Sequence, residues 1–567
     1  MSGHYTSNNS LLNDTFWVVL LSQRDLSGQV PINFVPQPAV SLTAACFGNN
    51  RYDGEAGCLC ISNLLTVGYR RLIVDLYWST ELRQWLFCPV SIPSSSSGSS
   101  QPSVHQLGPY SCTDSFNITT MTDVLQGYFQ ATRDSTSAQF MYLILNLHAA
   151  ANASAPDEPA PAPSGAELPS GSQLLGTVIN DALETYIYSP HQLSQDRSNL
   201  NESWYHDTRD WLIPLSSYFV TNTDGNGIQS TQDGWPCGSY LETVLDKRLL
   251  LGWGSVDPQM KGYNFSGDSP YIFPAADVTS NVTVTPAPDG VGLQSGCFFE
   301  PHVTDVSRVN SSWAESASLT VNGNLTTGAL GDASLMLQNF TSCGISPVVN
   351  ETLSGKTADE NVDQYRNLSV SSTWSWAIGE PQNISALANT QNLDNTNELF
   401  RCAVMDLTVS GHWRAGNCSD EYRAACRVNG SPYSWVLSSS KGSFFAAPNA
   451  CPEHTTFDVP RTGLENTYLY RTAFSLLGDS NEQRVWVNFN SLDVQYCWVL
   501  GGPNATCGYI PDADDLQRRT ILVPTIAAIV ILIITALTLF VKCNANRRSS
   551  RRRKRVIEGW EYEGVPS

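Results

Sequence analysis

The sequence has 567 residues, enough for two or three domains that each bury a core of their own. Its apolar and charged fractions, 41% and 15%, are those of a folded globular protein and exclude a chain that is disordered throughout. The formal net charge of −20 argues against a nucleic-acid partner, because binding to phosphates needs clustered cations.

Cysteines and glycosylation sequons point to the secretory pathway. Fourteen of the fifteen cysteines precede residue 520, without a CxxC pair or a Cys/His spacing suited to zinc. This even set predicts disulfides in an oxidising compartment, and buried thiols of a cytosolic protein are the alternative. Sixteen N-x-S/T sequons agree with the first interpretation. We expect glycans at Asn8, Asn13, Asn117, Asn152, Asn201, Asn264, Asn281, Asn310, Asn324, Asn339, Asn350, Asn367, Asn383, Asn417, Asn429 and Asn504.

The N-terminal segment, residues 1–13, does not look like a signal peptide. It has no basic region, and the apolar run that follows, Phe16–Leu21, is too short for one. Since a luminal domain needs a signal sequence, we expect that one precedes the first residue of this sequence.

Residues 14–290 alternate between strand-like and helical patterns. Short apolar runs lie at 16–21, 71–77, 140–147, 213–220 and 248–253. Several are apolar throughout, as in strands covered on both faces, and residues 172–188 place apolar side chains on one helical stripe. This alternation predicts an α/β domain of the TIM-barrel type. A serine-rich stretch at 91–103 and an Ala/Pro-rich stretch at 149–172 are expected to be surface insertions.

Five phrases carry a resemblance to a known family. They are LLSQRDLSGQVPINF (20–34), CISNLLTVGYRRLIVDLYW (60–78), MYLILNLHA (141–149), GWPCGSYLETVLDKRLLLGWGS (234–255) and VWVNFNSLDVQYCWVLGGPNATC (485–507). The chain is similar in these phrases to the fungal family called maintenance of telomere capping protein 6. The resemblance implies a single-pass membrane protein whose N-terminal part is a phospholipase-C-like barrel.

The barrel departs from its catalytic relatives at both expected histidines. Phosphodiesterase barrels of this type use one histidine as base and another as acid, each at a strand end. Here the first segment reads PAVSLTAAC (38–46) and the second LFCPVSI (86–92), and neither contains histidine. The resemblance therefore implies a barrel that does not cleave phosphodiesters.

Other polar side chains are expected at the barrel mouth, where barrel enzymes place their chemistry. Asp25 follows the first apolar run, Asp75 lies within the run at 71–77, and Asn146 and His148 end the run at 140–147. Two carboxylates and a histidine suffice for acid–base or hydrolytic chemistry. The alternative, which we favour, is that they bond loop backbone and each other. The sequence contains no HExxH, GxSxG, P-loop or GxGxxG motif and predicts neither cofactor nor metal.

The clearest cysteine spacing lies further along the chain, in WSWAIGEPQN (374–383), CAVMDLTVSGHWRAGNC (402–418) and DEYRAAC (420–426). These phrases resemble the C-terminal half of a C-type-lectin-like domain, an α+β fold. Trp413 stands five residues before Cys418, and Cys426 eight residues after it, as in that family. By the resemblance, Cys402 pairs with Cys418, and Cys426 with Cys343.

The calcium ligands of such lectins are only partly matched. Glu380 corresponds to the first ligand, but Trp413-Arg414-Ala415 replaces the family's Trp-Asn-Asp, so two oxygen donors are missing. The resemblance therefore implies, for residues 291–430, a binding or structural module without calcium. Three further cysteines and the phrase VWVNFNSLDV predict a β-rich extension over residues 431–519.

Residues 520–541 read TILVPTIAAIVILIITALTLFV, without a charge. At about 1.5 Å per residue this segment can cross a hydrocarbon core of about 30 Å, and a buried core helix is the alternative. Eight Lys or Arg residues follow it and two precede it, so we expect residues 542–567 in the cytosol and the rest in the lumen or outside the cell. The run RRSSRRRKR resembles a nuclear-import signal, but beside a membrane helix we favour contact with anionic lipid head groups.

Together these features predict a single-pass type I membrane glycoprotein without enzymatic activity. The family resemblance implies a part in telomere capping, which a luminal protein can fill only indirectly. One alternative is a hydrolase of wall glycans or lipid head groups that uses Asp25, Asp75 and His148. Another is a surface receptor for glycans or proteins.

Overall fold

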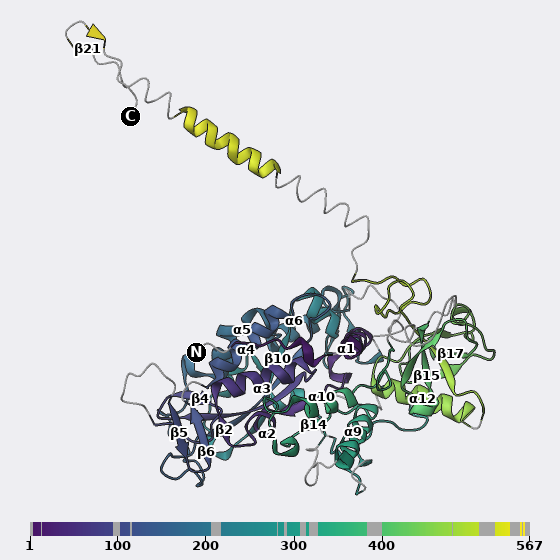
Figure 1. Ribbon diagram of the computed structural model, residues 1–567, viewed down its shortest axis with the longest axis horizontal. Coiled ribbons are helices and arrows are strands. Elements are labelled where there is room, and N and C mark those ends of the chain that lie inside the picture. The colour runs from purple at the N-terminus through teal and green to yellow at the C-terminus, as the bar shows by residue number, and fades with distance from the viewer. Residues whose placement is uncertain are drawn as a thin grey trace. The chain divides into compact units, whose positions relative to one another are not determined.

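The computed structural model describes residues 4–12, 14–93, 103–113, 116–205, 217–280, 282–288, 292–306, 313, 315–316, 327–382, 400–478, 480–509, 528–544, 556–557 and 560–561 (Figure 1). The chain divides into a first unit that ends at Cys507 and a second unit that begins at Gly508.

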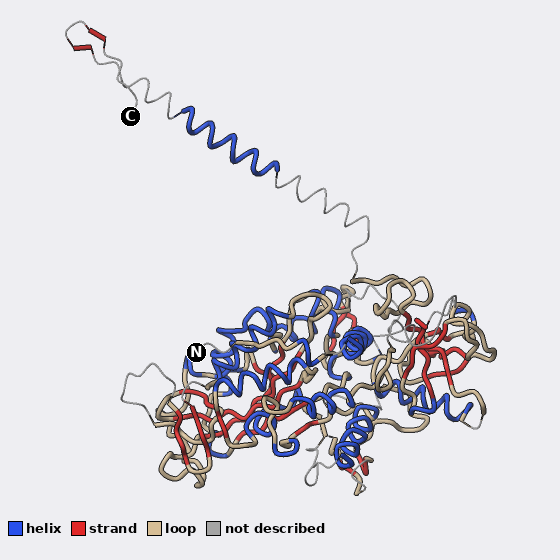
Figure 2. Tube along the Cα trace, viewed as in Figure 1, coloured by secondary structure: helices blue, strands red, loops and turns tan. Residues whose placement is uncertain are grey.

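A mainly parallel sheet of seven strands lies in the first unit (Figure 2). Its strands are β1 (Ala39–Ser41), β3 (Arg71–Ser79), β4 (Gln84–Leu86), β7 (Met141–Ala149), β10 (Leu249–Val256), β11 (Ile272–Phe273) and β14 (Val348–Val349). The order is β11–β10–β7–β3–β1–β14, with every neighbouring pair parallel, and β4 is antiparallel to β3. Among the described strands none joins β14 to β11, so the sheet is an open α/β barrel.

Helices flank the strands of this sheet (Figure 2). They are α1 (Asp14–Ser27), α2 (Leu42–Phe47), α3 (Gly54–Thr66), α4 (Ile118–Ala131), α5 (Leu175–Leu183), α6 (Pro190–Ser198), α7 (Phe265–Asp268), α8 (Ala275–Val278), α9 (Thr327–Ser342) and α10 (Val362–Ser371). Several of them begin at side-chain caps: for α3 the Asp53 carboxylate accepts from Glu55 N and Ala56 N, and for α4 the Asn117 side chain accepts from Thr120 N. Burial under these helices explains why β3 and β7 are almost continuously apolar.

The sequence predicted three of the five apolar runs correctly. The runs at 71–77, 140–147 and 248–253 form β3, β7 and β10, and α5 lies within the predicted helix at 172–188. For the run at 213–220, residues 213–216 lie outside the described part of the chain, and residues 217–220 are not a strand.

The prediction of a first strand at 16–21 is wrong, because these residues lie within α1. Phe16, Val18 and Val19 are buried there in a core that also contains Trp374 and Trp413. Packing against these tryptophans outweighs the strand preference of the two valines.

The prediction that the barrel domain ends at residue 290 is wrong. Strand β14 pairs with β1, with Ala39 opposite Val348, so residues beyond 290 belong to the same sheet. In the described part of the first unit, three small sheets lie outside it. They are β2 (Arg51–Tyr52) with β5 (Val104–Leu107) and β6 (Tyr110–Thr113), β8 (Thr221–Thr223) with β9 (Gln229–Thr231), and β12 (Thr285–Pro286) with β13 (Leu293–Ser295).

A second large sheet spans the two segments predicted as a lectin-like domain and its extension. Its strands are β15 (Phe400–Asp406), β16 (Trp413–Asn417), β17 (Arg423–Val428), β18 (Trp435–Leu437), β19 (Thr455–Phe457) and β20 (Arg484–Asn490), with helix α12 (Gly463–Leu477). The order is β16–β15–β20–β17–β18, with β19 on β17. Because β20 lies between β15 and β17, the boundary predicted at residue 430 falls inside one sheet.

Six disulfides join Cys46 to Cys60, Cys88 to Cys112, Cys297 to Cys343, Cys402 to Cys418, Cys426 to Cys451, and Cys497 to Cys507. The bond between Cys402 and Cys418 agrees with the prediction. The predicted bond between Cys343 and Cys426 is wrong, because Cys451 follows a turn that packs beside β17 and therefore lies next to Cys426. The thiols of Cys58, Cys237 and Cys543 are unpaired in the structure.

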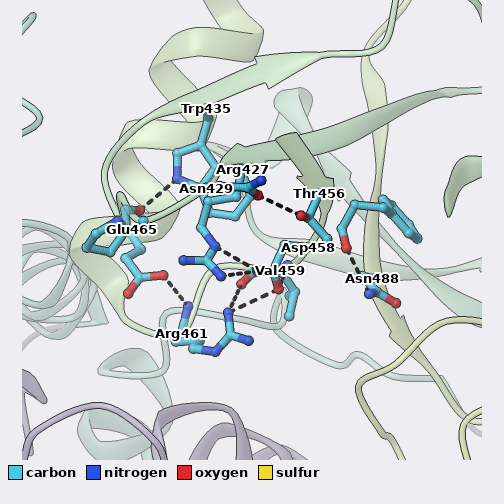
Figure 3. Close-up of polar contacts among 12 residues, drawn as sticks. Arg427, Asn429, Trp435, Thr456, Asp458, Val459, Arg461, Glu465 and Asn488 are labelled. Carbon is cyan, nitrogen blue, oxygen red and sulfur yellow. Dashed lines mark hydrogen bonds and ion pairs between the residues drawn. The ribbon is translucent and has the colours of Figure 1, made fainter. Parts of the chain in front are cut away.

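A buried cluster of charged side chains lies beside the second sheet (Figure 3), and one of its members contacts the barrel domain. Asp458 accepts from Arg427 Nη2 at 2.6 Å and from Arg461 Nη1 at 3.0 Å. Glu465 accepts from Arg461 N at 3.0 Å and from the Tyr218 hydroxyl of the barrel at 2.8 Å. The bond from Tyr218 to Glu465 links the cluster to the barrel domain across 247 residues of sequence.

The second unit contains a helix at residues 528–544, with exposed apolar side chains from Ile529 to Val541. Residues 520–527 of the predicted membrane segment lie outside the described residues. In the described part of the chain, no helix has both the length and the apolar character needed to cross a membrane. A short hairpin, β21 (Val556–Ile557) with β22 (Trp560–Glu561), follows.

Candidate functional site

Five polar side chains meet at the carboxyl ends of four neighbouring barrel strands. Asp75 lies on β3, and Asn146 and His148 lie on β7, where Asp75 is opposite Asn146 and Tyr77 is opposite His148. Thr43 lies in the first turn of α2, directly after β1, and Asp257 directly follows β10. We call these five residues, Thr43, Asp75, Asn146, His148 and Asp257, the mouth cluster. Parallel strands bring their carboxyl ends to one edge, which explains the convergence.

Asp75 uses both carboxylate oxygens within the cluster. Its Oδ2 accepts from Thr43 Oγ1 at 2.5 Å, and its Oδ1 accepts from Asn146 Nδ2 at 2.7 Å. His148 Nε2 lies 3.4 Å from the same Oδ1. Burial raises the pKa of Asp75, but hydrogen bonds from His148, Thr43 and Asn146 outweigh burial and hold the pKa below its usual value.

His148 lies between two carboxylates. Its Nδ1 is 2.9 Å from Asp257 Oδ2, its Nε2 faces Asp75, and the Tyr77 ring stacks on it with centroids 4.8 Å apart. Burial lowers the pKa of His148, but the hydrogen bonds and charges of the two carboxylates outweigh it and raise the pKa. The geometry therefore favours an imidazolium whose two ring nitrogens both donate within the cluster.

Asp25 is not part of this site, contrary to the prediction. It lies in α1 and forms an ion pair with Arg24, whose Nη2 is 2.7 Å from Asp25 Oδ1. Arg24 Nη1 also donates to Ala138 O, just before β7 begins, so Asp25 lies at the amino-terminal end of the strands. The error follows from reading the run at 16–21 as a strand.

Sequence reasoning missed Thr43 and Asp257. Thr43 lies in the segment 38–46, which was searched only for a histidine, and Asp257 comes directly after a correctly predicted strand. A search for any polar residue at strand ends would have found both. The two segments where catalytic histidines were expected instead contribute cysteines to disulfides, Cys46 with Cys60 and Cys88 with Cys112.

The residues that match lectin calcium ligands are engaged by protein groups. Glu380 Oε2 accepts from Gln382 N at 3.0 Å and from Ala415 N at 3.4 Å, and burial raises the pKa of Glu380. Arg414 Nε lies 3.3 Å from Asp406 Oδ2. Within the described residues, no group of three or more His, Cys, Asp or Glu side chains is suited to a metal ion.

None of the sequon asparagines in the described part of the chain is buried. Exposed ones are Asn152, Asn201, Asn264, Asn350, Asn367, Asn429 and Asn504, and half-buried ones are Asn8, Asn117, Asn339 and Asn417. Asn13, Asn281, Asn310, Asn324 and Asn383 lie outside the described residues. The buried asparagines Asn33, Asn63, Asn466, Asn488 and Asn490 are not in sequons.

Comparison with known proteins identifies the family. The model of the MTC6 partial TIM-barrel domain matches residues 11–375. The chain belongs to the maintenance of telomere capping protein 6 family. The matched range ends beyond β14, in agreement with a partial barrel that continues past residue 290.

Family members from several yeasts align with the chain. The protein named Maintenance of telomere capping protein 6 from Candida albicans (strain WO-1) is 24% identical and covers 99% of this chain and 96% of its own length. The protein of that name from Debaryomyces hansenii is 24% identical, and the alignment covers 97% of this chain and 94% of that protein. The protein of that name from Saccharomyces cerevisiae (strain ATCC 204508 / S288c) is 25% identical, and the alignment covers 78% of this chain and 74% of that protein. No solved structure matches the chain.

Proposed function

We propose that this protein is a membrane-anchored luminal glycoprotein that supports telomere capping indirectly, and that its barrel is a non-catalytic module. The observation that carries the second part is the closed hydrogen-bond network of the mouth cluster. The capping role rests on the family, whose yeast members are named for it.

Within the mouth cluster, hydrogen bonds to neighbouring side chains occupy His148 and Asp75. A general base or acid must reach a substrate proton directly or through one water. Both ring nitrogens of His148 face carboxylates, and both oxygens of Asp75 accept bonds from neighbours. A substrate would have to break these charge-assisted hydrogen bonds, which are among the strongest in proteins, before either residue could act.

Membrane anchorage and glycosylation are supported by separate features. Residues 520–541 are uncharged and apolar in sequence, and the basic residues that follow favour a cytosolic tail that contacts anionic lipids. Six disulfides suit the oxidising lumen. Seven sequon asparagines in the described part of the chain are exposed, which leaves room for glycans at these positions. A luminal protein does not touch a chromosome end, so its effect on capping passes through other components.

An array of fungal wall glycans and lipid head groups tests the non-catalytic role. The purified chain is applied with calcium and with a chelator, and both retention and turnover are scored. We expect no turnover of any compound. Retention without turnover would identify a binding module for glycan or lipid, and loss of retention with chelator would place a calcium site in it. Turnover that Asp75→Asn abolishes, while folding is kept, would overturn the proposal.

A hydrolase is the second candidate, and one observation favours it. The Asp257 side chain is 42% exposed, and the pKa of its partner His148 is raised, as a general acid near neutral pH requires. If a substrate displaced Asp257, His148 Nδ1 would face it. The variant Asp257→Asn distinguishes the candidates, since it should change turnover of any substrate found on the array and should leave a non-catalytic protein without measurable turnover.

A further inference from the structure

A cavity of about 420 Å³ lies at the end of the barrel opposite the mouth cluster. Its wall is formed by the N-terminal segment, by α1, by the C-terminal ends of α3 and α4, and by the residues that lead into β3 and β7. Helices α1, α3 and α4 are labelled in Figure 1. The volume falls within the range of small-molecule sites, roughly 300–1,000 Å³.

Arg70 is a buried cation in this wall. Arg70 is only 6% exposed. Among the described residues, its guanidinium forms no ion pair with a carboxylate. Burying an unpaired charge is unfavourable, so an unpaired guanidinium at a cavity indicates a missing anion.

The guanidinium of Arg70 is held in place on two of its edges. Nη1 donates to Leu65 O at 2.6 Å and to Tyr69 O at 3.1 Å, and Nε lies 3.5 Å from Gln139 Oε1. Its Cζ lies 5.8 Å from the ring centroid of Tyr128. In the described part of the chain, Nη2 has no hydrogen-bond partner. A fixed group with one unused donor binds an anion at little entropic cost.

Asp134 is the one carboxylate among the described residues of the cavity wall, and its own loop already satisfies it. It accepts from the backbone N–H and hydroxyl groups of Thr136 and Ser137. These bonds outweigh burial and lower its pKa, so it stays charged without being available to Arg70. A second buried guanidinium, that of Arg248, donates to Thr132 O in the same wall. The cationic side of the cavity therefore has no partner within the wall.

The rest of the wall is aromatic and apolar. Tyr5 and Tyr128 meet edge to face with ring centroids 5.3 Å apart, and Trp17, Leu12 and Leu65 complete this surface. Trp17 is half-buried although it lies on a helix whose neighbours Val18 and Val19 are buried. Such a surface suits the apolar body of a ligand, because it removes apolar area from water.

We propose that this cavity binds a small carboxylic acid, with the carboxylate on Arg70 and an aromatic or branched apolar body between Trp17 and Tyr128. The proposal concerns a site distinct from the mouth cluster and does not depend on the proposed function.

Isothermal titration calorimetry tests the proposal with 4-phenylbutyrate as the probe. The full chain is held in lipid nanodiscs, and empty nanodiscs give the blank. We expect saturable binding of one molecule per chain. The uncharged analogue 4-phenylbutanol should bind about ten-fold more weakly or worse, because it cannot form the charge-assisted bond. Inorganic phosphate should not bind in the same range.

Three variants locate the site. Arg70→Met should weaken the binding of 4-phenylbutyrate about ten-fold or more. Arg133→Met is the matched control, because it removes an exposed positive charge outside the cavity wall, and it should leave binding unchanged. Ala131 is exposed at the rim, so Ala131→Trp should fill the cavity without disturbing the core and should abolish binding.

Three results would overturn the proposal: absence of saturable binding by the wild-type chain, equal binding of the alcohol, or full binding by Ala131→Trp. Binding of phosphate in place of 4-phenylbutyrate would overturn the carboxylic-acid ligand. If Arg70→Met does not fold, the Ala131→Trp result alone decides.

Discussion

Replacing Asp458 with asparagine removes a buried carboxylate that forms ion pairs with two buried arginines beside the second sheet (Figure 3). Its two partners, Arg427 and Arg461, have side chains that are 6% and 2% exposed. After the substitution, Glu465 is the remaining nearby carboxylate, among the described residues, whose charge interacts with both guanidinium groups. Water cannot reach them to compensate.

The size of the effect follows from this burial. Removing one partner of a buried ion pair costs about 3–5 kcal/mol. Unfolding a unit of about 500 residues has an entropy of roughly 1 kcal/mol/K at about 2.1 cal/mol/K per residue, so the melting temperature should fall by about 3–5 °C.

Thermal unfolding followed by circular dichroism at pH 7 measures this effect. Glu482→Gln is the matched control, because Glu482 forms ion pairs with Arg423 and Lys441 that are partly exposed. Exposed pairs contribute at most about 1 kcal/mol, so the control should shift the melting temperature by no more than about 1 °C. Equal shifts for Asp458→Asn and Glu482→Gln would refute the conclusion that the buried Asp458 ion pairs stabilise the fold more than the partly exposed pairs of Glu482 do.

Three further predictions concern the mouth cluster and the disulfides. His148→Gln should destabilise the protein at pH 5.5 and much less at pH 9. The pKa of His148 is raised in the folded state, so its protonation stabilises the fold fully below the unfolded-state pKa of about 6.5, and this stabilisation is lost as the pH rises through the folded-state pKa. A larger loss of melting temperature at pH 9 than at pH 5.5 would contradict this. Asp75→Asn should destabilise by about 1–3 kcal/mol at pH 7, with the difference from wild type shrinking as acid protonates the wild-type carboxyl, since its pKa is lowered; a pH-independent difference between pH 2 and 7 would argue against it. Non-reducing peptide mapping should recover Cys426 linked to Cys451, and a peptide linking Cys426 to Cys343 would contradict the structure.

The sequence was informative where one local pattern decides the structure. Strands β3 and β7 are apolar over most of their length, so their type is evident, and the polar exceptions Asp75 and His148 stand out as site candidates. Helix α1 could not be recognised in this way. Its valines favour a strand locally, and only packing against distant tryptophans such as Trp374 makes it a helix.

Long-range partners could not be deduced from spacing. Cys418 follows Cys402 on the neighbouring strand of a hairpin, so this disulfide is local and agrees with the prediction. Cys426 had several candidate partners on both sides in the sequence, and the fold of the segment that brings Cys451 beside it decides the pairing. In the same way, the position of β14 in the barrel sheet depends on the whole path of the chain from β1.

The central claim is that the barrel supports capping without catalysis. The most direct test replaces the codon for His148 with a glutamine codon in the organism that encodes this chain, and then measures chromosome-end capping at normal levels of the variant protein. The account predicts capping equal to wild type, because the side chain serves only the hydrogen-bond network of the mouth cluster. Loss of capping with the protein folded and at normal abundance would contradict it and would show that His148 acts chemically.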